Sequence, residues 1–162
     1  MSSSHPSRRS VHISFVCTGN ICRSPMAEIV FVAALRQEGL AHRVRVSSAG
    51  TSAWHVGEPV DPRTAETLRR AGYDCDHVAA QVGARHLSAD LLVALDSGHL
   101  ETLRRLVAQP QRVVLLRSFD PAAGRNLDVP DPYFGGNYRF DEVLGMVCAA
   151  VPGLLAWVRS QL

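Results

Sequence analysis

Residues 15–25 read FVCTGNICRSP, and this stretch indicates both the kind of fold and the chemistry of the chain. It follows a short β-rich run and precedes a run with apolar residues at helical spacing. A strand therefore delivers Cys17 into a tight loop, with Arg23 and the start of a helix behind it. This arrangement predicts an anion pocket, because backbone N–H groups of the loop and of the first helical turn can point at phosphate oxygens.

The same loop supplies a nucleophile and a cation. The guanidinium of Arg23 can bind two phosphate oxygens at once, and the positive surroundings favour the thiolate form of Cys17 near neutral pH. The Ser24 hydroxyl can either donate to the Cys17 sulfur or cap the helix that Pro25 begins. These residues predict phosphoryl transfer through a cysteine. The alternative, an inert buried cysteine beside an ordinary turn, leaves this combination in this register unexplained.

Each remaining residue of the loop has a physical role in holding phosphate. Gly19 lets the backbone approach the anion closely, and Asn20 tolerates a left-handed turn. The residues that we expect to bind phosphate are Thr18, Gly19, Asn20, Ile21, Cys22 and Ser24.

Strands and helices alternate along the chain without hairpin signals. Strand patterns occupy residues 11–16, 44–48, 91–95 and 113–116, and helical patterns occupy residues 26–35, 62–71, 98–107 and a C-terminal region from Arg139 that we expect to break near Pro152 and Gly153. This order predicts an α/β fold, a small doubly wound four-stranded parallel sheet with helices on both faces. Ligands of such sheets lie at the carboxyl ends of the strands, where Cys17 falls.

Composition excludes several classes of protein. The chain has 162 residues, 46% apolar and 20% charged, which suits one globular domain. A net charge of +2 gives no reason to expect nucleic acid or an acidic membrane as partner. No apolar run approaches the roughly 20 residues that span a membrane. Residues 1–10 are rich in serine and lack an apolar core, so we expect a disordered tail and not a secretory signal.

Four cysteines, Cys17, Cys22, Cys75 and Cys148, are too few for a disulfide framework in a domain of this size. A zinc site would need a second close pair of ligands, for which Cys75 with His77 is the only candidate, and we expect no metal. A reducing, cytoplasmic setting follows. The sequence leaves open whether the protein leaves the cell by a route that needs no signal peptide.

The run at residues 17–25 resembles the signature of the low-molecular-weight protein tyrosine phosphatases. Further matches follow in order: SAGT at residues 48–51, WHVG at 54–57, ALD at 94–96 and DPY at 131–133. The set most resembles the mycobacterial-type phosphatase A branch. It implies a single phosphatase domain over residues 11–162, acting on phosphotyrosine-containing proteins as a monomer or weak homodimer. One departure is Ala80, where many relatives have an arginine.

The resemblance also selects a general acid. Spacing alone leaves Asp61, Asp120 and Asp131 open, because all three precede proline and the first two can simply cap a helix or start a turn. The resemblance implies that Asp131 protonates the leaving group and later activates water, while Cys17 carries the phosphoryl group. No cofactor is implied, since Arg23 and the backbone dipoles stabilise the charge.

Trp54 and Tyr133 are implied as two walls around a phenyl ring, which favours phosphotyrosine over the shorter phosphoserine. Without the resemblance, Trp54 reads as a half-buried loop aromatic, and Tyr133 and Phe134 read as lids of the core. Cys22 lies in the same curled loop as Cys17, so oxidation could join the two reversibly. The alternative role for Cys22 is that of a small residue lining the loop.

The sequence argues against three rival functions. An arsenate reductase of this fold needs two cysteines close together after the third strand, and residues 90–107 contain none. The resembling protein arginine phosphatases carry threonine where this chain has Ile21. A non-catalytic phosphate-binding module would lack the nucleophile, the arginine or the acid.

Overall fold

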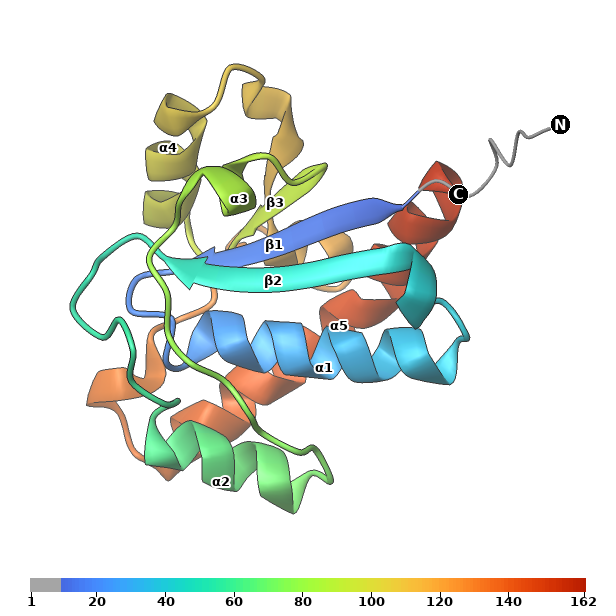
Figure 1. Cartoon of the computed structure of the whole chain (residues 1–162). Helices are drawn as coiled ribbons and strands as arrows, with labels where there is room; N and C mark the ends of the chain where they lie inside the picture. Colours follow the sequence, from blue (N-terminus) through green and yellow to red (C-terminus); the bar gives the residue numbers. More distant parts are fainter. Residues whose placement is uncertain (1–9) are drawn as a thin grey trace, which may run out of the picture.

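Four strands form one parallel sheet in the order β2-β1-β3-β4 (Figure 1). A computed structural model describes residues 10–162, so the tail expected at residues 1–10 lies outside the described residues except for Ser10. The strands are β1 (Val11–Cys17), β2 (Val44–Gly50), β3 (Leu91–Ala94) and β4 (Val113–Leu115). The prediction of an α/β fold with a parallel four-stranded sheet is confirmed.

Strand β1 lies in the centre of the sheet and delivers the nucleophile loop to one edge. Its last residue, Cys17, pairs with Gly50, the last residue of β2, so both strands end at the same level. A Cβ atom at position 50 would lie only 2.5 Å from the carbonyl oxygen of Thr18. Glycine at this position therefore lets β2 pass directly beside the loop that follows Cys17.

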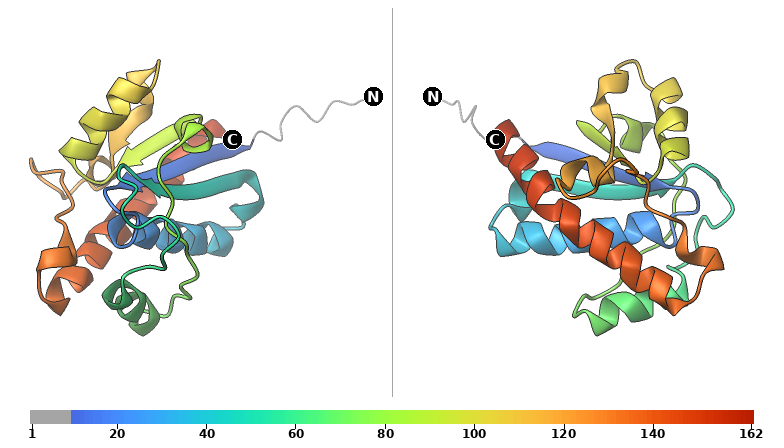
Figure 2. Two further views of the ribbon diagram at one scale, coloured as in Figure 1. Left: turned by 60° about the vertical axis from the view of Figure 1, so that its left-hand side comes forward. Right: turned by 180° about the vertical axis from the view of Figure 1, so that it is seen from behind.

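Helices cover both faces of the sheet (Figure 2). They are α1 (Arg23–Gln37), α2 (Pro62–Arg70), α3 (Ala84–Leu87), α4 (Ser97–Leu106) and α5 (Asn137–Gln161). Helices α1 and α5 bury the larger core together with Ile13 and Phe15 of β1. Helix α4 buries Leu103 against Val16 and Leu92 on the other face. Because both faces are covered, strands β3 and β4 read as continuous apolar runs.

Four short 3-10 helices complete the described chain: η1 (Ala41–Arg43), η2 (Pro110–Arg112), η3 (Leu116–Phe119) and η4 (Pro132–Phe134). The sequence pattern gave no sign of α3, which is a single turn. It also placed the start of α1 at Met26, whereas the helix begins at Arg23. The arginine of the loop is therefore already part of the helix, and its side chain projects from the first helical turn.

Helix α5 corrects two expectations. The break expected near Pro152 is wrong, because the helix runs through it with Ala150, Leu154 and Val158 buried in the core. Packing on both sides of the proline offsets the backbone hydrogen bond that it removes. A Cβ at Gly153 would lie 2.3 Å from the carbonyl oxygen of Phe119, so glycine there admits η3 against α5.

The expectation that no apolar segment reaches membrane-spanning length is also wrong. Helix α5 has 25 residues, and an 18-residue window of it has a mean hydropathy of 1.6. By length and composition alone it could cross a membrane, but helices in protein cores meet the same criterion. Here α5 packs against α1 and α2.

Candidate active site

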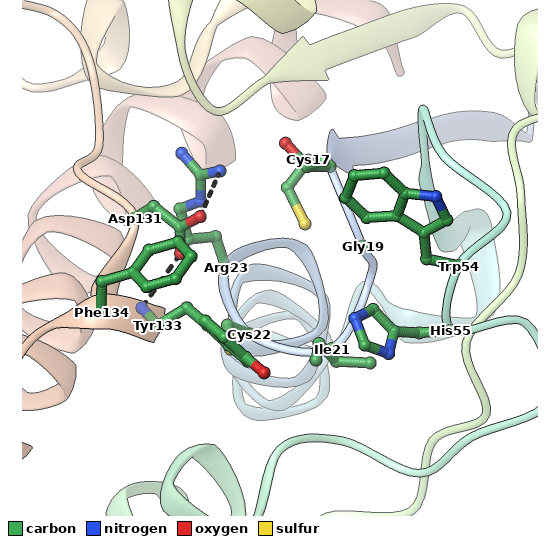
Figure 3. Close-up of a pocket in the computed structure, with 11 residues that line it drawn as sticks. Cys17, Gly19, Ile21, Cys22, Arg23, Trp54, His55, Asp131, Tyr133 and Phe134 are labelled. Carbon is green, nitrogen blue, oxygen red and sulfur yellow. Dashed lines mark hydrogen bonds and ion pairs between the residues drawn. The ribbon is translucent and has the colours of Figure 1, made fainter.

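A pocket of about 240 Å³ opens at the carboxyl end of β1 (Figure 3). The Cys17 side chain points into it from the end of the strand. Trp54 and His55 lie on one side, and Tyr133 and Phe134 lie on the other. The lining residues are Cys17, Thr18, Gly19, Ile21, Cys22, Arg23, Trp54, His55, Asp131, Tyr133 and Phe134. The structure thus brings three distant segments of the chain to one cavity.

The backbone of the loop is oriented by its carbonyl groups. The carbonyl oxygens of Cys17 and Thr18 accept the N–H groups of Thr51 and Ser52 at 2.8 and 3.0 Å. The carbonyl of Ile21 accepts the N–H of Asp61 at 2.9 Å, and that of Asn20 is 3.0 Å from Nε2 of His77. In a trans peptide the N–H points opposite to the C=O. With the carbonyls bound from outside, the N–H groups are left to face the pocket as an anion-binding nest.

Asn20 fixes the turn in which it lies. Its φ of 58° places it in the left-handed region, as the sequence predicted. Its amide nitrogen donates to the hydroxyls of Ser24 at 2.8 Å and Ser48 at 3.0 Å. Its amide oxygen accepts the backbone N–H of Ala80 at 2.9 Å and lies 3.1 Å from Nε2 of His77. The departure at Ala80 therefore leaves this network intact, because Ala80 contributes its backbone only.

The Cys17 sulfur is buried and faces Ser24. The hydroxyl oxygen of Ser24 lies 2.9 Å from the sulfur, and the Ser24 backbone N–H donates to it at 3.4 Å. Since Asn20 donates to the same hydroxyl oxygen, the hydroxyl proton has two acceptors within reach, the sulfur at 2.9 Å and the carbonyl oxygen of Ala49 at 3.5 Å, and the sulfur is the nearer. Helix α1 begins earlier, after Cys22, which makes no side-chain capping bond. Of the two roles open to Ser24, the structure shows the contact with sulfur and not the helix cap.

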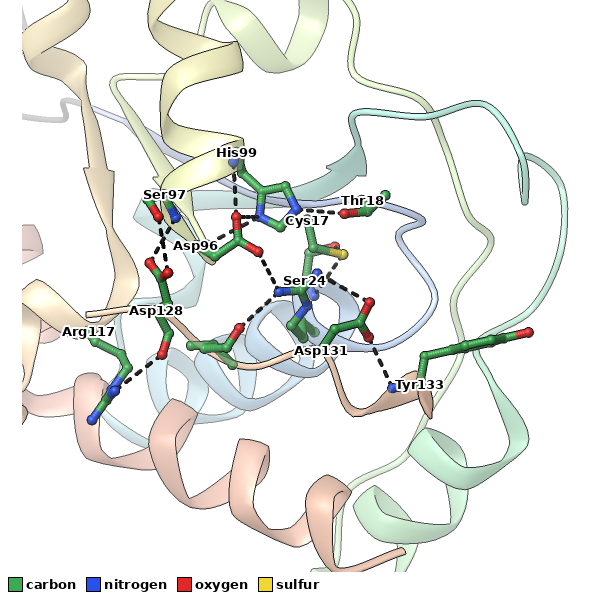
Figure 4. Close-up of polar contacts among 12 residues, drawn as sticks. Cys17, Thr18, Ser24, Asp96, Ser97, His99, Arg117, Asp128, Asp131 and Tyr133 are labelled. Atoms are coloured by element: carbon green, nitrogen blue, oxygen red, sulfur yellow. Dashed lines mark hydrogen bonds and ion pairs between the residues drawn. The ribbon is translucent and has the colours of Figure 1, made fainter. Parts of the chain in front are cut away.

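Arg23 is almost fully buried and is held in one orientation (Figure 4). Its Nη1 donates to Oδ2 of Asp96 and to the carbonyl oxygen of Val129, both at 2.9 Å. Its Nη2 lies 3.7 Å from Oδ2 of Asp131. Burial alone would raise the pKa of Asp96, but the hydrogen bond from the backbone N–H of His99 and the hydrogen bond and charge of Arg23 outweigh it and hold the pKa below its ordinary value. An ionised Asp96 therefore orients the guanidinium.

His99 joins this network as a neutral ring. Burial lowers its pKa to about 4. Its Nδ1 accepts the backbone N–H of Asp96 at 3.2 Å, so the ring proton is on Nε2. Nε2 then donates to the hydroxyl of Thr18 at 2.8 Å. The first turn of α4 thus supports both the arginine and the nucleophile loop.

The structure gives different roles to the three aspartates that precede a proline. Asp61 caps α2 by accepting the backbone N–H of Arg63 at 2.8 Å and also pairs with its guanidinium at 3.0 Å. Asp120 accepts a backbone N–H two residues further on, within its own turn. Asp131 alone among the three lines the pocket, close to Arg23.

The aromatic walls are more open than the sequence indicated. Trp54 is 81% exposed and Phe134 is 89% exposed, so the alternatives of a half-buried loop aromatic and a core lid are wrong for these two. Tyr133 is 42% exposed, and the Arg63 guanidinium lies 5.4 Å from the centre of its ring. Arg63 also stacks 4.7 Å from the ring of Phe140. This stacking holds the Tyr133 wall in place.

The sequence analysis assigned no role in the site to four residues, although two of them, His55 and Asp96, lie within the matched runs WHVG and ALD. His55 and Phe134 line the pocket, and Asp96 and His99 support Arg23 and the loop. Asp96 follows β3 directly, at the same edge of the sheet as Cys17, and this position was the available signal for it. His99 gave none, because its role depends on a contact with Thr18, 81 positions away.

All four cysteines are free thiols. Burial raises the pKa of Cys22 to about 12, so this thiol stays protonated at neutral pH beside Cys17 in the same pocket. Cys75 and Cys148 do not line that pocket. Within residues 10–162, no group of three His, Cys, Asp or Glu side chains is placed to hold a metal ion.

Comparisons with known proteins agree on one family. The family model described as "Low molecular weight phosphotyrosine protein phosphatase" matches residues 12–162. The chain is 56% identical to low molecular weight protein-tyrosine phosphatase A of Mycobacterium tuberculosis, over 94% of each chain. It is also 56% identical to a low molecular weight protein-tyrosine-phosphatase of Streptomyces coelicolor, over 92% of this chain and 94% of that one. A crystal structure of a protein tyrosine phosphatase from Entamoeba histolytica superposes with a TM-score of 0.89 at 28% identity, covering 94% of this chain and 99% of the other.

Proposed function

The chain belongs to the low molecular weight phosphotyrosine protein phosphatase family, and we propose that Cys17, Arg23 and Asp131 carry out its reaction. The protein is a phosphoric monoester hydrolase with phosphotyrosine proteins as its substrates. The assignment of roles rests on one observation: the sulfur, the guanidinium and the carboxylate share a single pocket.

The first step transfers the phosphoryl group to sulfur. The Cys17 thiolate attacks phosphorus in line, while Arg23 and the inward N–H groups of the loop hold the three equatorial oxygens. The P–O bond to the phenol breaks, and protonated Asp131 gives its proton to the departing oxygen. Arg23 is already oriented by Asp96, so it needs little rearrangement to bind the phosphate.

The second step regenerates the enzyme. Asp131, now a carboxylate, takes a proton from water as the water oxygen attacks the phosphocysteine. The S–P bond breaks, inorganic phosphate forms, and sulfur leaves as a thiolate. The Ser24 hydroxyl, 2.9 Å from the sulfur, stabilises that leaving thiolate.

The walls of the pocket support an aromatic substrate. Trp54 and Tyr133 stand on opposite sides of the opening, above the buried sulfur (Figure 3). A phenyl ring between them would bury its faces while its phosphate reaches the loop. The shorter side chain of phosphoserine would not span the distance from the rim to the loop.

Substitution of the nucleophile tests the proposal. We expect Cys17→Ser to retain inorganic phosphate binding and to lose turnover of phosphotyrosine peptides. In the unaltered enzyme, phosphate or vanadate should slow alkylation of Cys17 by iodoacetate, because both occupy the same pocket. Cys148→Ser is the matched control. This cysteine lies outside the pocket, so the variant should keep full activity. Appreciable turnover by a clean Cys17→Ser preparation would contradict the assignment.

The arginine phosphatase alternative is tested through Ile21, which lines the pocket. Two peptides that differ only in carrying phosphotyrosine or phosphoarginine should give a much higher kcat/KM for phosphotyrosine. Ile21→Thr should narrow that preference, because it makes this wall of the pocket polar. A preference for phosphoarginine in the unaltered enzyme would overturn the tyrosine assignment.

We further propose that the enzyme acts in the cytoplasm as a monomer or weak homodimer. The four free thiols support a reducing compartment. Sedimentation at several protein concentrations measures the oligomeric state. Fractionation of cells and culture medium tests the location, including release by a route without a signal peptide.

A further inference from the structure

Few contacts hold the side chain of Asp131 in the pocket. Its carboxylate accepts the backbone N–H of Tyr133 at 3.0 Å and lies 3.7 Å from Nη2 of Arg23. The side chain is 45% exposed. Residues 120–131 contain no helix or strand. The position of this carboxylate therefore depends on the backbone that carries it, which is η4 after Asp131 and a segment without helix or strand before it.

That backbone is stiff between Val129 and Asp131. Pro130 and Pro132 have fixed φ angles, and each restricts the residue before it to extended conformations. Asp131 accordingly has φ −76° and ψ 116°. Val129 is fully buried, and its N–H donates to the carbonyl oxygen of Leu95 at 2.8 Å. A small displacement at Val129 would thus move the carboxylate of Asp131 as a unit.

Asp128, the residue before Val129, is hydrogen-bonded to the first residue of helix α4 (Figure 4). Oδ1 of Asp128 accepts the backbone N–H of Ser97 at 2.9 Å, and Oδ2 accepts the Ser97 hydroxyl at 3.0 Å. Ser97 is the first residue of α4, where the helix dipole favours a carboxylate. From the other side, Nη1 of Arg117 donates to the carbonyl oxygens of Asn126 at 2.6 Å and Asp128 at 3.2 Å. We call Ser97, Arg117 and Asp128 the loop latch.

We propose that the loop latch positions Asp131 for proton transfer, with Asp128 as its central positioning residue. The same turn of α4 carries Asp96, which orients Arg23, and His99, which binds the nucleophile loop. The N-terminus of α4 therefore sets the relative positions of Arg23, Cys17 and Asp131. The inference rests on the proposed role of Asp131 as the acid.

The test is Asp128→Ala assayed on two substrates. On phenyl phosphate, whose leaving group needs the acid, we expect kcat/KM to fall about 10- to 100-fold, the effect of a small misplacement of a catalytic group. We compare kcat/KM because it reports transfer of the phosphoryl group to Cys17 and not the later hydrolysis, which both substrates share. On p-nitrophenyl phosphate the loss should be much smaller. Inhibition by inorganic phosphate should stay near its original value, because Asp96 still orients Arg23 and the nucleophile loop keeps its own contacts.

Two variants serve as controls. Asp128→Asn keeps an oxygen that can accept the Ser97 N–H, and it should recover most of the activity on phenyl phosphate. Asp120→Ala removes a carboxylate from the same loop that bonds only within its own turn, and it should leave kcat unchanged. A variant that was merely less stable would lose activity on both substrates equally, and this result would overturn the proposal.

A double variant separates the latch from the acid. Asp128→Ala combined with Asp131→Asn should be no slower on phenyl phosphate than Asp131→Asn alone, because the latch acts only through Asp131. Multiplied losses would overturn the latch and leave the acid assignment standing. The absence of any leaving-group-dependent loss in Asp131→Asn itself would instead overturn the acid assignment on which the latch rests.

Discussion

The hydroxyl oxygen of Ser24 lies 2.9 Å from the sulfur of Cys17, seven positions earlier, across the mouth of the nucleophile loop. A second donor, the Ser24 backbone N–H, reaches the same sulfur at 3.4 Å. Two donors aimed at one sulfur favour its negative form, both before attack on phosphorus and when the S–P bond breaks.

Ser24→Ala should therefore destabilise the Cys17 thiolate while phosphate binding by the loop stays intact. A hydrogen bond to a charged group contributes about 1.5–3 kcal/mol, so kcat should fall about 10- to 100-fold. The rate of iodoacetate alkylation of Cys17 at mildly acidic pH measures the thiolate directly and should fall as well. Inhibition by phosphate should change little, and an unchanged alkylation rate would show that the hydroxyl does not support the thiolate.

Oxidation of Cys17 should be reversible only while Cys22 is present. Mild peroxide converts the Cys17 thiolate to a sulfenic acid, and attack by the Cys22 sulfur then forms a disulfide and releases water. Dithiothreitol should restore activity in the original enzyme and much less in Cys22→Ser. Equal recovery in both proteins, or a peptide map without this disulfide, would reject the mechanism.

The pH dependence of this closure follows from the burial of Cys22. Burial raises its pKa to about 12, so its thiolate fraction is small at neutral pH. Well below that pKa, the fraction rises about tenfold for each pH unit, and the rate of disulfide closure should rise with it. Quenched-flow mass spectrometry of the loop peptide measures this rate. A rate that is flat across neutral pH would show that the protonated thiol or another group attacks.

Asp131→Asn should affect poor leaving groups most. We expect kcat/KM to fall roughly 10²–10⁴-fold on phenyl phosphate, the usual contribution of a general acid, and much less on p-nitrophenyl phosphate, whose phenolate leaves unaided. Steady-state kinetics on both substrates provide the measurement. Asp120→Asn is the comparison. A leaving-group-dependent loss in that variant, with none in Asp131→Asn, would show that Asp120 and not Asp131 is the general acid.

His86 should make the fold sensitive to acid. Its Nδ1 accepts the backbone N–H of Gly83 at 3.0 Å, so Nε2 carries the proton, and no hydrogen-bond partner for Nε2 is found within residues 10–162. Burial lowers its pKa to about 4 from an ordinary value of 6.5. Between these two values the unfolded chain binds more protons than the native one, so the free energy of unfolding falls as pH falls.

His86→Asn keeps an acceptor for the Gly83 N–H and removes the titration. Urea denaturation at about pH 7 and about pH 5 should show a drop in the free energy of unfolding that is smaller in the variant, by on the order of 1 kcal/mol. His99, whose pKa also falls to about 4, leaves part of the pH dependence in place. Identical drops in both proteins would mean that His86 does not titrate as its burial indicates.

The sequence determined the features that depend on neighbours along the chain. Alternating strand and helix patterns gave the parallel sheet, because each pattern reflects which side chains of one element are buried. The left-handed turn at Asn20 and the cap of α2 at Asp61 were also predictable, since the groups involved are within a few residues of each other. The nucleophile loop was predictable for the same reason, because its residues are neighbours along the chain.

Tertiary structure decided what depends on contacts between distant segments. It separated Asp131 from Asp61 and Asp120, although all three have the same local sequence context before proline. It carried α5 through Pro152, where packing of buried side chains overrode a local preference.

The sequence placed Asp96 at the same edge of the sheet as Cys17, but its hydrogen bond to Arg23, 73 positions away, became evident only in the fold. Hydrogen bonds of this kind form only because β1 and β3 end side by side at one edge of the sheet. The chain carries the chemistry of the site in a local motif, but the orientation of that chemistry comes from residues that only the folded sheet brings within hydrogen-bonding distance.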